Sequence, residues 1–409
     1  MRVARLDWIE GEGAFYADDL MAIRGGARHD GFAYLGDPVT PGHRAVRSPA
    51  RALLLRLETE AGAHGWGDAV AVQYSGVGGR DLPIDPAALA GEVERAEAAL
   101  REAGEVDFAG GSALVDALRI DGRQLHTALR YGLSQALLNA EAAERGIPPL
   151  RVLAPITGLA APRLLPVYAQ SGDERRLNAD RMILRGVEVL PHGLFNSLEA
   201  VGPDGGAFLD YVRWLRGRVA ELGAPGYAPR LHLDVYGMLG IVAEQDTARL
   251  ADLLVAAEAA ADGLPLTIEA PTFGADQDET IALLAALRAE LHGRGSGVLL
   301  CADEFCNGDE DVARFVAAGA VDLIQIKMPD LGCLTEAIAA ARACRAAGLG
   351  VFIGGSCAET DVSAVTSTQV ALAVEADQVL AKPGMGVDEG VSIVRNAMRR
   401  ALVDWERSA

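Results

Sequence analysis

The stretch from Leu231 to Lys327 decides the fold, because it contains four short apolar segments that each end in a charged residue. These segments are Leu231-His-Leu-Asp234, Leu266-Thr-Ile-Glu269, Val298-Leu-Leu-Cys-Ala-Asp303 and Leu323-Ile-Gln-Ile-Lys327. The terminal charges follow one another at intervals of about one strand-and-helix unit. We therefore expect four successive parallel strands whose last side chains lie at one height.

The same alternation extends in both directions from about residue 161. Amphipathic helical stretches separate the apolar segments, and one of them carries Phe208, Val212 and Leu215 on a single face. The expected strands are Leu165–Ala169, Val187–Leu190, Leu231–Asp234, Leu266–Glu269, Val298–Ala302, Leu323–Ile326, Gly350–Ile353 and Gln378–Ala381. Eight such units predict a TIM-like (β/α)8 barrel over residues 161–409. An open doubly wound sheet is the alternative, and the lack of a GxGxxG motif after the first strand disfavours it.

In residues 1–160 the order of the expected elements is different, because the strands come first and the helices follow. We expect an opening strand at Arg2–Asp7, a hairpin formed by Ala52–Thr59 and Trp66–Val72, and helices at Pro86–Ala103 and Leu125–Arg145. This order predicts an N-terminal α+β domain that caps the barrel.

A glycine-rich loop, Gln73-Tyr-Ser-Gly-Val-Gly-Gly-Arg-Asp81, follows the expected hairpin. We interpret it as a mobile loop that covers a site, with an inert surface loop as the alternative.

Composition and charge narrow the classes of partner. The net charge is −20, from 57 acidic and 37 basic residues, which disfavours binding to nucleic acid and to anionic membranes. The N-terminus lacks a hydrophobic signal core, and the sequence has no apolar run long enough for a transmembrane helix. The cysteine count is odd, with five residues and no CxxC pair, which favours reduced thiols. We expect a cytoplasmic protein.

Three carboxylates, from Asp234, Glu269 and Asp303, end successive expected strands at the mouth of the barrel. A single acid after a strand is more often a helix N-cap. Three crowded together would repel one another unless a divalent cation sits between them. Oxygen ligands without histidine or cysteine suit Mg²⁺ better than zinc.

Other polar residues end strands at the same rim. Lys327 follows two β-branched residues, and beside a cation its pKa is expected to fall, so that it can take a proton from carbon. His192 ends the second strand, across the mouth from Lys327. Gln170 and Gln325 are neutral donors suited to carboxylate oxygens. Ser356 offers a hydroxyl for an anion, next to the backbone of Gly354-Gly-Ser-Cys357.

At these residues the chain resembles the enolase superfamily, and more closely the methylaspartate ammonia-lyase family. The matching stretches run in order along nearly the whole sequence: Arg28-His-Asp-Gly-Phe, Val72-Gln-Tyr-Ser-Gly-Val-Gly-Gly-Arg-Asp, Leu125-His-Thr-Ala-Leu-Arg-Tyr-Gly, Ala169-Gln-Ser-Gly-Asp, Val189-Leu-Pro-His, His232-Leu-Asp-Val-Tyr-Gly, Ala302-Asp-Glu-Phe-Cys-Asn, Gln325-Ile-Lys-Met-Pro-Asp-Leu-Gly and Leu380-Ala-Lys-Pro-Gly-Met-Gly-Val-Asp-Glu-Gly.

The resemblance implies an Mg²⁺-dependent carbon–nitrogen lyase. Its metal ligands would be Asp234, Glu269 and Asp303, and Lys327 would remove the C3 proton from L-threo-3-methylaspartate. An enediolate whose charge the metal stabilises would then lose ammonia to give mesaconate. His192 would lie on the opposite face of the substrate. The resemblance also implies K⁺ as a possible activator and a homodimer.

The resemblance further assigns the residues that hold the substrate. Gln325 would support the metal-bound carboxylate, and Gln73 would close over the amino group. The other carboxylate would be held by Gln170, the Ser356 hydroxyl and the backbone at Cys357.

Three positions depart from the family pattern, which usually has threonine, asparagine and threonine where this chain has Ser356, Ala358 and Met328. Because of these departures, the sequence leaves open which side chain the substrate carries.

Two other hypotheses about the function also remain open. An enolase-superfamily epimerase, racemase or dehydratase could use the same metal and bases on another amino or hydroxy acid. A non-catalytic Mg²⁺-dependent binder is the third, which the pair Lys327 and His192 disfavours.

Overall fold

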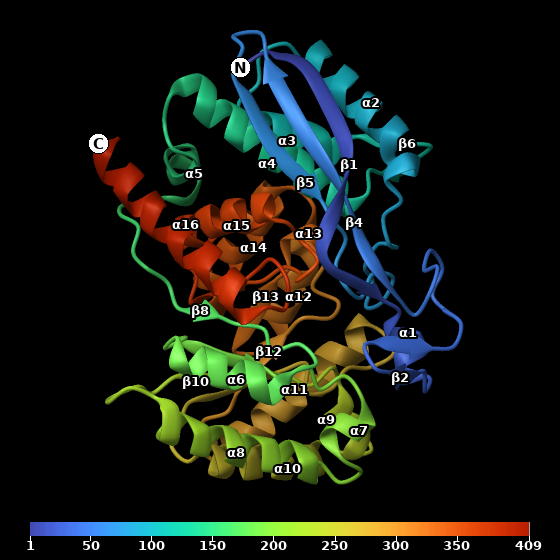
Figure 1. The fold of residues 1–409 in the computed structure, drawn as a ribbon, viewed down its shortest axis with the longest axis vertical. Coiled ribbons are helices and arrows are strands. Elements are labelled where there is room, and N and C mark those ends of the chain that lie inside the picture. The colour runs from blue at the N-terminus through green and yellow to red at the C-terminus, as the bar shows by residue number, and fades with distance from the viewer. Residues whose placement is uncertain (409) are drawn as a thin grey trace.

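The computed structural model describes residues 1–408. Its N-terminal part is built on a three-stranded antiparallel sheet, in which β1 (Val3–Asp18) pairs with β4 (Arg47–Thr59) and β4 pairs with β5 (His64–Ala69). Apolar residues alternate along β4, so one face of the sheet is buried against α4 (Thr127–Arg145), while the other is partly exposed. Figure 1 shows this sheet and its helices above the barrel.

Glycine allows α4 to approach the sheet closely. A Cβ on Gly65 or Gly67 of β5 would collide with the backbone of α4, and a Cβ on Gly132 of α4 would collide with the backbone at Asp68. Three glycines therefore set the distance between the sheet and its main helix.

Smaller elements complete this part of the chain. They are α1 (Leu20–Arg24), β2 (Arg28–Asp30), β3 (Ala33–Leu35), α2 (Pro86–Glu102), α3 (Phe108–Ala117), β6 (Arg119–Ile120), β7 (Arg123–Gln124) and α5 (Pro149–Thr157).

Eight parallel strands then close into a barrel in the order β10-β11-β12-β13-β14-β15-β8-β9. The strands are β8 (Val167–Tyr168), β9 (Val189–His192), β10 (Arg230–Asp234), β11 (Leu266–Glu269), β12 (Leu299–Ala302), β13 (Leu323–Ile326), β14 (Gly350–Ile353) and β15 (Gln378–Leu380). The helices that follow them are α6 (Arg175–Leu184), α7 (Leu198–Val201), α8 (Gly206–Leu222), α9 (Met238–Val242), α10 (Thr247–Ala261), α11 (Gln277–Gly293), α12 (Asp309–Ala318), α13 (Met328–Leu331), α14 (Leu334–Ala346), α15 (Asp361–Ala373) and α16 (Val387–Arg407).

The barrel and the α+β capping domain predicted from the sequence are confirmed. The clearest difference lies in the first strand, which was expected to end at Asp7 and instead continues to Asp18. Its second half carries glycine and exposed polar residues, so the hydrophobic pattern does not reveal it. Backbone pairing with β4 extends it as far as the pair Asp18 and Arg47.

Two further differences are smaller. The second barrel strand lies two residues later than expected, at Val189–His192. Helices α3 and α5 were not predicted.

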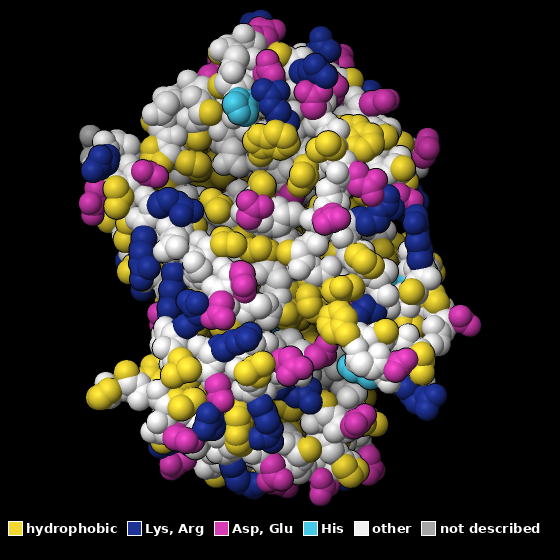
Figure 2. Space-filling model, viewed as in Figure 1, with side chains coloured by type: hydrophobic (Ala, Val, Ile, Leu, Met, Phe, Trp, Pro, Cys, Tyr) yellow, Lys and Arg dark blue, Asp and Glu magenta, His cyan; other side chains and the backbone are white. Residues whose placement is uncertain are grey.

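No helix within residues 1–408 is long and apolar enough to cross a membrane. Acidic and basic side chains are interspersed over the face shown in Figure 2.

Candidate active site

The three carboxylates singled out in the sequence meet at the mouth of the barrel. One oxygen each from Asp234, Glu269 and Asp303 lies within 4.8 Å of the others, and all three side chains are buried. Strand register explains the convergence, because Asp234 and Glu269 are directly paired at the ends of β10 and β11. Asp303 follows β12 by one residue, as Lys327 follows β13.

The electrostatics of this acid cluster favour a bound cation. Burial, and then the neighbouring charges of Asp234 and Asp303, hold the pKa of Glu269 well above its usual range. Hard oxygen donors that repel one another fit a divalent metal ion, which would neutralise them.

A second possible ligand group consists of His232, Glu269 and Cys301. It shares Glu269 with the acid cluster, but its thiol is a less suitable donor than a carboxylate. Burial lowers the pKa of His232 to about 3 and raises that of the Cys301 thiol well above its usual range. A cysteine sulfur is a soft donor, which a hard divalent ion such as Mg²⁺ does not favour. The three carboxylates are the better metal site.

Lys327 lies directly against the acid cluster. Its Nζ donates a hydrogen bond of 2.8 Å to Asp303 Oδ2. Burial and the nearby Arg80 lower the pKa of Lys327, but the charges of Asp303 and Asp330 and the hydrogen bond to Asp303 outweigh them, so it lies above the usual value. The fall in the Lys327 pKa that the sequence predicts beside a bound cation stays a prediction.

His192 reaches the acid cluster from the other side. Its Nε2 lies 3.5 Å from Asp234 Oδ2 and 3.4 Å from the Tyr236 hydroxyl. His192 adopts a positive φ of 70° at the end of β9, and its Nδ1 has no hydrogen-bond partner among the described residues. Lys327 and His192 both line one pocket.

The glycine-rich loop also lines this pocket, through Gln73, Tyr74 and Arg80. The Gln73 backbone N–H donates to Ser356 Oγ over 3.0 Å, and Cys357 Sγ lies 3.3 Å from Gln73 Oε1. The loop therefore joins the capping domain to the segment that follows β14.

A buried ion pair stabilises the segment after β14. The buried pair Lys382 and Glu359 is joined by an ion pair of 2.9 Å, and the Ser356 backbone N–H donates to Glu359. A Cβ at Gly355, where φ is +138°, would collide with both members of the pair, so only glycine fits. The Ser356 backbone N–H is thus already used. Its hydroxyl oxygen accepts from Gln73 and Ala358, which leaves the hydroxyl proton free to donate.

The two expected glutamines lie on either side of the pocket. Gln170 follows β8, and its Nε2 has no partner among the described residues. Gln325, within β13, donates through Nε2 to Glu269 Oε1. All the site residues expected from the sequence line the pocket except Asp303, which contacts Arg80 and Lys327.

The sequence analysis did not assign several residues that line or border the pocket. Arg80 bridges Asp303, at 3.0 Å, and Asp330, at 2.7 Å. Tyr168, Tyr236 and Phe352 supply aromatic walls. Tyr168 and Phe352 belong to the strand segments already identified, and inward alternation could have selected them. The contact of Arg80 with Asp303 spans more than two hundred residues, and no local signal indicates it.

A (β/α)8 barrel with an α+β cap, three carboxylates on successive strands and two potential bases across one pocket define an enzyme of the enolase-superfamily type. Comparison with family models matches residues 1–156 to the methylaspartate ammonia-lyase N-terminus and residues 160–407 to the methylaspartate ammonia-lyase C-terminus. The chain belongs to the methylaspartate ammonia-lyase family, whose members are carbon–nitrogen lyases.

Individual relatives match this chain over nearly their whole length. The chain is 45% identical to the methylaspartate ammonia-lyase of Haloarcula marismortui, covering 98% of this chain and 97% of the relative. It matches the crystal structure of β-methylaspartase from Clostridium tetanomorphum in an Mg complex with a TM-score of 0.92 and 40% identity, over 100% of both chains. It matches the Citrobacter amalonaticus enzyme containing (2S,3S)-3-methylaspartic acid with a TM-score of 0.94 and 42% identity, over 99% of this chain and 100% of the other.

Proposed function

We propose that this enzyme eliminates ammonia from L-threo-3-methylaspartate to give mesaconate. The observation that carries the proposal is the placing of Lys327 against the cluster of Asp234, Glu269 and Asp303, at the edge of a pocket that His192 faces. A carboxylate substrate bound at the acid cluster through a cation would bring its neighbouring carbon beside the Lys327 amine.

Asp234, Glu269 and Asp303 would hold Mg²⁺, since three buried oxygen donors suit this hard ion. When bound, Mg²⁺ supplies positive charge that makes a proton next to a carboxylate easier to remove. A monovalent cation such as K⁺ is proposed as an activator from the family resemblance alone.

Lys327 acts as the general base. Its Nζ takes the proton from C3, the electron pair forms the C2–C3 double bond, and the C2–N bond breaks to release ammonia. His192 faces the substrate from the opposite side, where Asp234 and the Tyr236 hydroxyl orient its ring. That position would let it serve a substrate of the other configuration at C3.

The remaining polar residues hold the substrate. Gln325, which contacts Glu269, supports the carboxylate near the acid cluster. Gln170, with its unpartnered Nε2, the Ser356 hydroxyl and the backbone at Cys357 hold the other carboxylate. Gln73 accepts a hydrogen bond from the substrate amino group.

Three broader properties are proposed from the sequence and the resemblance. The enzyme is a homodimer, it acts in the cytoplasm, and its domains are residues 1–160 and 161–409. None of the roles above depends on these three properties.

The decisive experiment incubates the full-length chain with 3-methylaspartate, Mg²⁺ and K⁺ and follows the ultraviolet absorbance of mesaconate. Equal release of ammonia and mesaconate is the expected result. An epimerase or racemase would change the substrate's optical rotation without either product. A dehydratase would act on the hydroxy acid analogue and release no ammonia.

A further inference from the structure

On the side away from the pocket, the amide of Gln73 is hydrogen-bonded to a buried carboxylate. Its Nε2 donates a hydrogen bond of 2.8 Å to Asp18 Oδ2, and the backbone N–H of Asp18 donates back to the Gln73 carbonyl over 2.9 Å. Asp18 is completely buried at the end of β1, and Gln73 is 6% exposed. On the pocket side, Gln73 Oε1 lies 3.3 Å from Cys357 Sγ.

A buried arginine side chain forms an ion pair with Asp18. Arg47 Nε donates to Asp18 Oδ1 over 2.8 Å, and Arg47 Nη2 donates to Asp18 Oδ2 over 2.7 Å. Such a two-point contact between guanidinium and carboxylate is strong and fixes geometry as well as charge. An ionised carboxylate has no proton to donate, so Asp18 can only accept hydrogen bonds.

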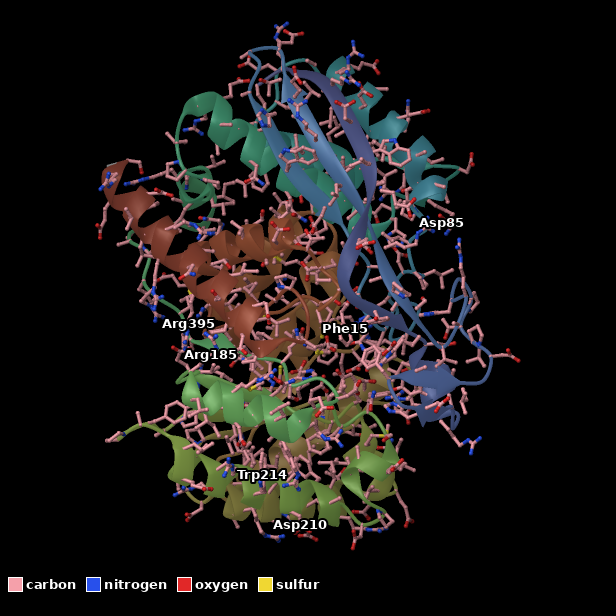
Figure 3. The ribbon with its side chains drawn as sticks, in the orientation of Figure 1. Phe15, Asp85, Arg185, Asp210, Trp214 and Arg395 are labelled. Atoms are coloured by element: carbon pink, nitrogen blue, oxygen red, sulfur yellow. The ribbon has the colours of Figure 1, made fainter. Side chains whose placement is uncertain are left out.

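Arg47 is itself anchored to both domains. Its Nη1 donates to Asp173 in the loop after β8 and to the Phe32 carbonyl. Aromatic rings surround its guanidinium carbon, with the centroid of Phe32 at 4.4 Å and that of Tyr34 at 4.9 Å. Figure 3 shows Phe15, another ring of this group, where β1 descends from the sheet toward the barrel.

This arrangement decides which end of the Gln73 amide faces the pocket. An amide can present its oxygen, which accepts, or its nitrogen, which donates, and a rotation of 180° exchanges the two. Asp18 accepts from Nε2, and the reversed amide would set two acceptors against each other. The oxygen is therefore the end that remains for the pocket.

We propose that Asp18, held by Arg47, is a positioning residue that fixes Gln73 Oε1 toward the pocket as an acceptor for the substrate ammonium group. The inference rests on the proposed function, in which Gln73 binds that group. An ammonium only donates, so the fixed oxygen attracts it, whereas the amide nitrogen in its place would repel it.

The test measures KM and kcat for 3-methylaspartate, and the inhibition constant of mesaconate, which lacks the amino group, with full-length protein in saturating Mg²⁺. In Asp18→Asn the residue can donate as well as accept, so Gln73 loses its preferred orientation. We expect KM to rise about tenfold or more, as for the loss of a hydrogen bond to a charged group. The inhibition constant of mesaconate should stay within about twofold, because hydrogen bonding to the amino group does not affect it.

A second substitution in Asp18→Asn should restore the acceptor. In Asp18→Asn/Gln73→Glu, the amide of the new residue 18 donates to a carboxylate at position 73, which offers only acceptors to the pocket and leaves the total charge unchanged. KM should return to within about threefold of wild type, whereas Gln73→Glu alone places two carboxylates together and should bind substrate worse. A merely structural role for Asp18 predicts no such recovery.

Asp180→Asn is the matched control, because Arg218 grips Asp180 with the same two-point geometry far from the pocket. It should change neither KM nor kcat. If Asp18→Asn does not fold, Arg47→Lys replaces it, since lysine keeps the charge but loses the two-point grip. Its KM should rise while the inhibition constant of mesaconate does not.

Three results would overturn the positioning role: an unchanged KM in Asp18→Asn, no recovery in the double variant, or equal weakening of mesaconate. A wild type that forms no mesaconate would instead count against the proposed function. In that case calorimetric titration of wild type and Asp18→Asn with 3-methylaspartate decides the positioning role, and equal affinities would refute it.

Discussion

Lys327 and Asp303 are in direct contact, through a hydrogen bond of 2.8 Å between Nζ and Oδ2. The other oxygen of Asp303 lies 3.0 Å from Arg80, which comes from the glycine-rich loop. One carboxylate therefore connects the proposed base, the proposed metal site and the loop over the pocket.

Lys327→Ala tests the base. The variant lacks the amine that takes the C3 proton, so we expect kcat for the threo substrate to fall by about 10³-fold or more. Mg²⁺ affinity should remain close to wild type, because Asp234, Glu269 and Asp303 are all retained. Mesaconate absorbance reports kcat, and calorimetry reports Mg²⁺ binding. Retained turnover would remove Lys327 from the role of base.

Separate substitutions of Asp234, Glu269 and Asp303 by alanine test the metal site. Each removes one of three clustered oxygen donors, and we expect each to weaken Mg²⁺ binding by about tenfold or more, as for loss of a supporting group in a metal site. A chelator should abolish activity of the wild type, and added Mg²⁺ should restore it. Asp322→Ala is the control, since Asp322 is an acid on the barrel that pairs with Arg288 away from the pocket. Unaltered affinity in all three variants would show that the ligands lie elsewhere.

Much of the barrel could be predicted because its signal is local. Each strand is a short apolar run, and the side chain just past its end lies at the rim whatever the surrounding helices do. That rule located Asp234, Glu269, Asp303 and Lys327 before the fold was known. The glycine-rich loop could be recognised as a loop from its composition, and Gln73 entered the candidate site through the family resemblance.

Other features could not be predicted because they depend on contacts between distant parts of the chain. Arg80 meets Asp303 and Asp330 only once the loop lies over the barrel. Asp18 was not singled out, because the second half of β1 has no apolar alternation and its partner Arg47 begins a different strand. Residues that orient the site thus come from segments whose own pattern is weak.

The cysteines provide a test of burial. All five are free and buried. Burial is the largest cause that holds the pKa of the Cys357 thiol above its usual value, and it does the same for Cys306 and Cys344. Since the thiolate is the reactive form, the native enzyme should react very slowly with a disulfide reagent at neutral pH. Denaturation should release five equivalents. Fast reaction of Cys357 in the native enzyme would show that the pocket wall opens.

Arg80→Met tests whether the loop arginine neutralises the acid cluster. Arg80 is buried between Asp303 and Asp330, so its loss leaves two buried carboxylates with less positive charge, and we expect unfolding to become easier by about 3–5 kcal/mol. Mg²⁺ held by Asp234, Glu269 and Asp303 would return positive charge to Asp303. The melting temperature of Arg80→Met should therefore rise more on addition of Mg²⁺ than that of wild type. Arg218→Met, which breaks a more exposed ion pair with Asp180, should destabilise the fold much less and show the wild-type response to Mg²⁺. Thermal unfolding with and without Mg²⁺ measures both effects, and an equal Mg²⁺ response in Arg80→Met and wild type would mean that Arg80 and the metal do not share Asp303.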